Sequence, residues 1–66
     1  MEYFVIYKNE DLIAYCDNIY ELCDFSGLRI KDVNYKFKHA KDNVININVD
    51  KSRFKVYKFF DRKWGL

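Results

Sequence analysis

The chain has 66 residues and a mass of 8.1 kDa, which is enough for one domain and too little for a second hydrophobic core. Half of its residues are apolar, a third are charged and the formal net charge is +2, a composition that excludes a disordered chain. No apolar run approaches the roughly 20 residues of a membrane helix, so we expect one soluble domain over residues 1–66 with no membrane partner.

Two aromatic and β-branched runs open the chain. They cover residues 3–7 and 12–16 and are separated by a polar break, which predicts a β-hairpin. Asn18 then predicts a helix N-cap, because Glu21 follows three residues later as in a capping box. This short helix has an apolar stripe and ends at Gly27, where glycine can adopt the left-handed conformation. The stripe consists of Ile19, Leu22, Cys23 and Phe25.

A second helix is predicted over residues 30–40. Its buried stripe consists of Ile30, Val33, Phe37 and Ala40, and its other face is polar and cationic. We expect Asp32 to form an ion pair with Lys36 one turn later. Two helices joined through a glycine-containing turn are typical of a helix-turn-helix unit, whose second helix enters the major groove of DNA.

The last third of the chain predicts a second hairpin. Residues 44–49 alternate at period two, with Ile45, Ile47 and Val49 facing the core. With a turn at residues 50–53, Val49 would face Phe54 and Ile47 would face Val56. The tail bears more aromatic area than a terminus leaves in water, so we expect a dimer or partner contact there. Its residues are Phe59, Phe60 and Trp64.

These elements predict an α+β fold. It consists of an N-terminal β-hairpin, a helix-turn-helix and a C-terminal β-hairpin, and the four strands can join in one antiparallel sheet behind the two helices.

The charges are divided unevenly along the chain. Residues 1–28 carry six acidic residues against one lysine, for −5, and residues 29–66 carry eleven basic residues against four acidic ones, for +7. Such a chain can turn a basic surface toward a polyanion while its other surface repels it, which favours nucleic acid as a partner. The alternative is that the two halves neutralise each other across the fold.

The candidate site is the polar face of the second helix. Asn34 can recognise adenine through two hydrogen bonds, Lys31 and Lys38 can meet guanine edges or phosphates, and Arg29 and Lys41 can reach the flanking backbones. Tyr35 and Trp64 are aromatic residues that the packing of the core does not require. Either can stack on a base or anchor a protein partner.

No enzyme, metal site or cofactor is expected. Cys16 and Cys23 have a spacing that matches no zinc or redox motif, and no signal segment opens the chain, so we expect reduced, buried thiols in a cytoplasmic protein. His39 is the single histidine and has no ligand or catalytic partners at suitable spacing.

From Gly27 to Ser52, about 40% of the chain, the sequence resembles the lambda-type Cro repressors, which are small phage helix-turn-helix proteins. In that family a glycine turn leads into a recognition helix and then a strand; here the matching elements are Gly27-Leu28, Val33-Asn34, Phe37 and the run 44–52. The N-terminal hairpin departs from the family, as do Ile30, in place of a base-reading polar residue, and Lys51, in place of a turn glycine. The resemblance implies operator contacts at Arg29, Lys31, Asn34, Tyr35, Lys38 and Lys41, and a dimer contact at Phe59 and Phe60.

We therefore expect sequence-specific binding of double-stranded DNA by a homodimer, in a phage or prophage transcriptional regulator of the Cro repressor kind. The alternative is a phage-encoded inhibitor of a host protein, an anti-defence or host-takeover factor acting by protein–protein binding. Its acidic half would then imitate DNA through Glu10, Asp11, Asp17, Glu21 and Asp24. A structural accessory subunit is a third possibility.

Overall fold

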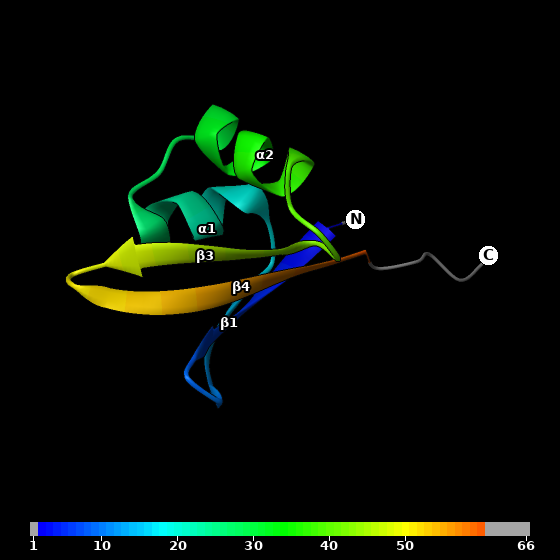
Figure 1. Ribbon diagram of the computed structural model, residues 1–66. Helices are drawn as coiled ribbons and strands as arrows, with labels where there is room; N and C mark the ends of the chain where they lie inside the picture. The colour runs from blue at the N-terminus through cyan, green and yellow to red at the C-terminus, as the bar shows by residue number, and fades with distance from the viewer. Residues whose placement is uncertain (1, 61–66) are drawn as a thin grey trace.

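The computed structural model describes residues 2–60 and contains two hairpins with a helix pair between them (Figure 1). The four strands form one antiparallel sheet in the order β2-β1-β4-β3, so the first and last strands pair at its centre. The predicted α+β fold is confirmed. The elements in chain order are β1 (Glu2–Lys8), β2 (Asp11–Cys16), α1 (Ile19–Ser26), α2 (Ile30–Lys38), β3 (Val44–Val49) and β4 (Ser52–Phe60).

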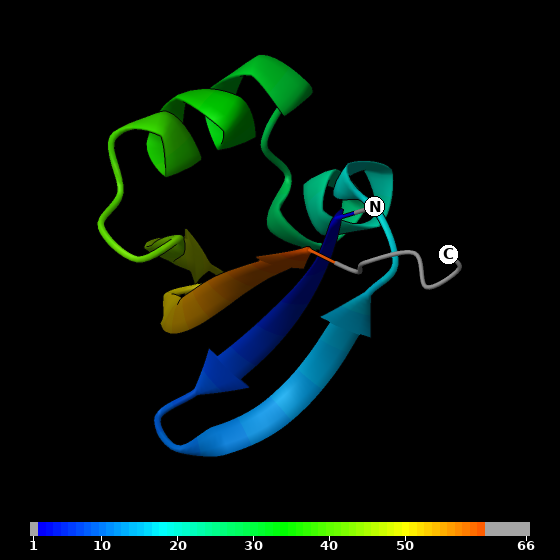
Figure 2. The same ribbon diagram turned by 90° about the vertical axis from the view of Figure 1, so that its right-hand side faces the viewer.

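Both helices lie on one side of the sheet, as Figures 1 and 2 show from two directions. α1 contacts β1, β2 and β3, whereas α2 contacts β3 and α1. The core lies between this helix pair and the sheet. Within the helix layer, α2 lies over the edge strand β3. The buried core residues are Phe4, Ile6, Cys16, Leu22, Val33, Phe37, Ile45, Ile47, Phe54 and Val56.

The predicted cap of α1 is confirmed. The backbone N–H of Glu21 donates to Asn18 Oδ1 at 3.0 Å, which satisfies one of the free donors of the first turn. The Glu21 carboxylate accepts from the backbone N–H of Asp17 at 2.8 Å, one residue before the cap itself. At the other end Gly27 has φ 75°, and its N–H donates to the carbonyl of Cys23 at 2.8 Å, which closes the helix.

α2 ends at Lys38, two residues before the predicted end at Ala40. The N–H of Ala40 donates to the carbonyl of Phe37, an i to i−3 bond that tightens the chain out of the helix. The left-handed residues Asp42 and Asn43 then turn it into β3. Ile30 was expected in the buried stripe, but its side chain is 38% exposed at the first helical position.

The register of the second hairpin differs from the prediction by two residues. Val49 pairs with Ser52 and Ile47 pairs with Phe54, because the turn contains two residues instead of four. Asp50 and its successor both have positive φ, at 50° and 68°, which is the geometry of a tight two-residue hairpin turn. A shift of two preserves side-chain faces, so the predicted division into buried and exposed residues on β3 and β4 is unaffected.

Candidate nucleic-acid interface

The polar face of α2 is open to solvent. Val33 and Phe37 point into the core and fix the rotation of the helix, so its remaining side chains face outward. A cationic and amide-bearing surface thus covers the outer side of the helix layer. The predicted DNA-contacting residues are all exposed: Arg29, Lys31, Asn34, Tyr35, Lys38 and Lys41.

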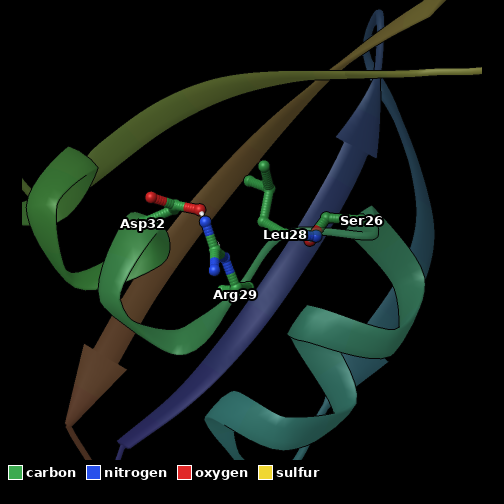
Figure 3. A network of polar contacts seen from close by, with 4 residues as sticks. All are labelled: Ser26, Leu28, Arg29 and Asp32. Carbon is green, nitrogen blue, oxygen red and sulfur yellow. Dashed lines mark hydrogen bonds and ion pairs between the residues drawn. The ribbon is translucent and has the colours of Figure 1, made fainter.

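The turn before α2 is held by short-range contacts (Figure 3). The N–H of Leu28 donates to Ser26 Oγ at 3.2 Å, and the Leu28 side chain packs against the core. Arg29 is the N-cap residue and has an extended backbone, but its side chain makes no capping bond. The turn therefore positions the start of α2 by backbone geometry and by the Leu28 anchor.

Asp32 does not pair with Lys36 as predicted. Its carboxylate lies 3.8 Å from Arg29 Nε, in an i,i+3 pair at the start of α2 (Figure 3). Both side chains are substantially exposed, so the pair contributes little to stability. Lys36 is therefore a further exposed cation on α2, in addition to the predicted ones. The sequence contained the reason, because Arg29 is three residues before Asp32 and can reach the same carboxylate.

Tyr35 projects from the outer face of α2 and is 65% exposed. Its ring lies 4.4 Å from the His39 imidazole between centroids, with the planes tilted by 53°. The two rings form an exposed aromatic pair on the last turn of the helix. Such a pair can contact a sugar, a base or an apolar partner side chain without disturbing the core.

Lys58 is a basic residue that belongs to the packing of the fold. Its ammonium lies 3.5 Å from the Glu2 carboxylate and 5.3 Å from the ring centres of Phe37 and Phe60. Among the ion pairs of residues 2–60, this contact joins the acidic half of the chain to the basic half, whereas the Arg29 pair lies within the basic half. In the described residues, the ion pairing between the two halves is thus limited to Lys58 and Glu2, on the core side of α2 and not among its exposed cations.

The predicted aromatic contact at the end of the chain is divided between two sides of the sheet. Phe59 stacks on Tyr3 at 5.3 Å on the side without helices, and Phe60 lies beside Lys58 on the helix side. Trp64 lies outside the described residues. In the described part of the chain, Phe59 and Phe60 therefore do not form one contact surface.

The acidic side chains are also separated. Glu10 and Asp11 lie at the β1–β2 turn, whereas Asp17 follows β2 and lies at its other end, with Asp24 beyond it on α1. The length of β2 separates the two groups by about 17 Å at the ordinary strand rise. The acidic half of the chain therefore does not form one continuous surface.

The two thiols belong to the packing rather than to a site. Cys16 is buried and Cys23 is half-buried, and both are free. Burial raises the pKa of each thiol, and carboxylates add to this effect: Glu21 and Asp17 for Cys16, and Asp24 for Cys23. Residues 2–60 contain no group of three or more His, Cys, Asp or Glu side chains placed to hold a metal ion, and no helix long and apolar enough to cross a membrane.

No protein-family model, no curated protein and no solved structure matches this chain.

Proposed function

We propose that the protein binds duplex DNA through α2, as a Cro-like transcriptional regulator. One observation carries the proposal: the helix buries Val33 and Phe37 and exposes its polar side chains. Lys31 and Lys38 lie opposite the buried pair, and Asn34 is exposed beside them. A helix in this orientation presents donors to solvent, as major-groove recognition requires. With its side chains an α-helix is about 10–12 Å across, which fits the major groove of about 12 Å.

Each exposed side chain has a distinct task in this proposal. Asn34, in the middle of the helix, offers an amide that matches the adenine edge, while Lys31 and Lys38 lie one turn away on either side and meet guanine edges or phosphates. Arg29 and Lys41 lie just outside the helix ends and contact the backbones on either side of the groove.

A symmetric homodimer must direct both copies of α2 toward the same side of the DNA. β3 is an edge strand of the sheet, and α2 packs over it. Pairing of two β3 strands about a twofold axis normal to the sheet would extend the sheet and keep both helices on one side. Contact through the side without helices would turn the two copies of α2 away from each other, so we propose β3 as the dimer edge.

The duplex proposal is tested by binding to palindromic and random AT-rich duplexes at about 50 and about 200 mM salt. If four to six phosphates are neutralised, the log–log salt slope is about −4 to −5 for each protomer. The double variant Asn34→Ala, Lys38→Ala should weaken binding at least tenfold, since each base contact contributes about 1–3 kcal/mol.

The matched control is Lys8→Ala at the far end of β1, which removes an exposed charge away from α2. It should leave affinity for the duplex within about twofold, because phosphate contacts act locally at this ionic strength. Absence of a salt-sensitive shift with either duplex would exclude duplex binding. The same result combined with copurification of a host protein would favour the inhibitor alternative, which the separated acidic groups support less well.

A further inference from the structure

The side of the sheet opposite the helices, called here the open face, is aromatic at one end. In the described part of the chain no helix covers it. Neighbouring strands place their rings together, because Tyr3 pairs with Phe59 and Val5 pairs with both Tyr15 and Tyr57. The rings of this aromatic end are those of Tyr3, Tyr7, Tyr15, Tyr57 and Phe59.

These rings exceed what the core requires, since they lie on the side of the sheet away from it. Phe59 is 42% exposed, and its ring lies within 14° of parallel to that of Tyr57, with 6.4 Å between centroids. Tyr57 and Phe59 are two residues apart on the same face of β4, and this centroid distance is the ordinary spacing of such neighbours. The rings therefore form a row along the strand, on which flat bases can stack.

A hollow of about 470 Å³ opens at these rings. Tyr7, Tyr57 and Phe59 form its aromatic wall, and Lys55 and Asn9 contribute polar groups at its edge. Its volume lies within the range of small-ligand sites, about 300–1,000 Å³. Aromatic surface beside an ammonium and an amide is suited to a base with its attached phosphate.

A second hollow, of about 420 Å³, continues the first along β4 and shares Lys55 and Asn9 with it. The second hollow is also lined by Arg53 and Asn46, so its wall carries a cation and an amide where the first hollow has aromatic rings. Neither Arg53 nor Lys55 has an ion-pair partner among residues 2–60. The open face thus changes along β4 from stacked rings to unpaired cations.

We propose that the open face binds single-stranded nucleic acid, with bases stacked at Tyr57 and Phe59 and phosphates at Lys55 and Arg53. Unpaired bases present flat faces to aromatic side chains, and the phosphates between them meet the cations. Glu10 lies at the edge of the aromatic hollow and repels phosphate, so it directs the backbone toward the Arg53 end.

The charges favour this occupant over a second copy of the chain. A face-to-face dimer would remove Lys55 and Arg53 of both copies from water, and Glu10 is the single acidic residue lining the two hollows, so each copy would supply fewer anions than cations. Duplex DNA fits less well, because its paired bases are stacked on each other and closed to side-chain rings. The proposal is independent of the duplex proposal, since α2 lies on the opposite side of the sheet.

The test is fluorescence anisotropy of labelled oligothymidylate and oligouridylate of about 12 nucleotides, with a duplex of equal length as comparison. The wild-type protein should bind at least one single strand. Phe59→Leu, which keeps an apolar side chain but removes the ring, should weaken this binding about fivefold or more, and Lys55→Ala should reduce its salt dependence.

Matched controls separate this surface from the rest of the molecule. Tyr20→Leu removes an exposed ring from α1, Lys8→Ala removes a cation outside the open face, and both should leave single-strand affinity within twofold. The α2 double variant Asn34→Ala, Lys38→Ala should also leave it unchanged, so that failure of one proposal can be distinguished from failure of the other. Equal affinity for the two oligonucleotides indicates that the open face contacts only bases and phosphates. Higher affinity for oligouridylate indicates an added contact to the ribose.

A spectroscopic measurement does not depend on the folding of any variant. Addition of oligothymidylate to the wild-type protein should shift the backbone amide resonances of residues 53–59 and leave those of 30–38 in place. Absence of binding to both single strands would overturn the proposal, as would shifts confined to α2. A concentration-dependent dimer that Phe59→Leu dissolves, without single-strand binding, would assign the open face to a second copy instead.

Discussion

Asp32 is the single acidic residue between Arg29 and Lys41, and its charge opposes the proposed contact with DNA. The Arg29–Asp32 pair is 79% and 44% exposed at its two side chains, so it contributes little to stability. Asp32→Asn removes a negative charge near the phosphates and frees Arg29. We expect duplex affinity to rise severalfold at low salt, corresponding to about 0.5–1 kcal/mol, and the gain to shrink as salt increases.

Titration of duplex into protein at two salt concentrations checks this prediction. Asp24→Asn is the matched control, because it removes the same charge from an exposed position on α1. Stability should fall by no more than about 1 kcal/mol, since Asp32 also interacts with the amino end of its helix. An equal gain in both variants would mean that net charge alone, and not the position of Asp32, controls affinity.

Cys16 makes stability depend on pH in the alkaline range. Burial raises the pKa of its thiol above the ordinary value of 9.0, and Glu21 and Asp17 raise it further. The unfolded chain loses this proton at a lower pH than the folded chain does. The stabilising contribution is therefore complete below about pH 9 and is lost as pH rises through the folded pKa.

Urea unfolding at a series of pH values from about 8 to about 11 measures this effect. The free energy of unfolding should fall more steeply for the wild-type protein than for Cys16→Ala, by at most about 1.4 kcal/mol per pH unit. Because the substitution also leaves a cavity, the slopes are compared and not the absolute values. Parallel curves for the two proteins would show that Cys16 does not cause the dependence.

The β3–β4 turn contains strain that a single substitution can remove. Asp50 and Lys51 both occupy the left-handed region, and Lys51, at φ 68°, stands where hairpin turns of this type favour glycine. Lys51→Gly should raise the free energy of unfolding by about 0.5–1 kcal/mol, because relief of strain exceeds the added freedom of the unfolded chain. Lys41→Gly, outside the left-handed region, is the control, and it should bring no gain in thermal or urea unfolding.

The same turn marks the limit of what the sequence predicts about the elements. Alternation along 44–49 and the Asn18 cap correctly predict a strand and a helix start, because both signals depend on neighbouring residues. The length of the turn does not follow from these signals, since Asp50 and Lys51 fit a four-residue connection as well as a two-residue one. The register was therefore wrong by two while the faces were right.

Of the two proposed binding surfaces, one could be predicted from the sequence and the other could not. The outer face of α2 follows from helical periodicity around Val33 and Phe37, so its exposed residues were predictable. The open face was not, because β1 is apolar on both sides: Phe4 and Ile6 face the core, and Tyr3 and Tyr7 face away from it. The sequence of such a strand predicts burial on both faces. Only the placement of both helices on one side shows that, among residues 2–60, no helix covers the other side.

At the scale of the whole molecule, the two proposed surfaces lie on opposite sides of one small domain. The cations of α2 face away from the sheet, and the rings and cations of the open face lie behind it. The net charge of +2 therefore understates the positive surface available to nucleic acid, since part of the acidic half lies at the β1–β2 turn and the rest around α1. Distribution, and not total charge, determines which ligands can approach.

The proposed dimer predicts a dependence on half-site spacing. With both copies of α2 on the same side of an extended sheet, two half-sites should be read when their centres are about 10 base pairs apart, one turn of the duplex. Adding about five base pairs rotates one half-site to the far side of the DNA. The second copy then cannot contact its half-site and its dimer partner at the same time. We expect cooperative binding of two chains at the first spacing and its loss at the second, measured by gel shift with light scattering to count chains.

Restoring a full turn with about five further base pairs should return part of the cooperativity. Equal, non-cooperative binding at all three spacings would mean that single chains read the DNA independently and that the β3 edge does not mediate pairing.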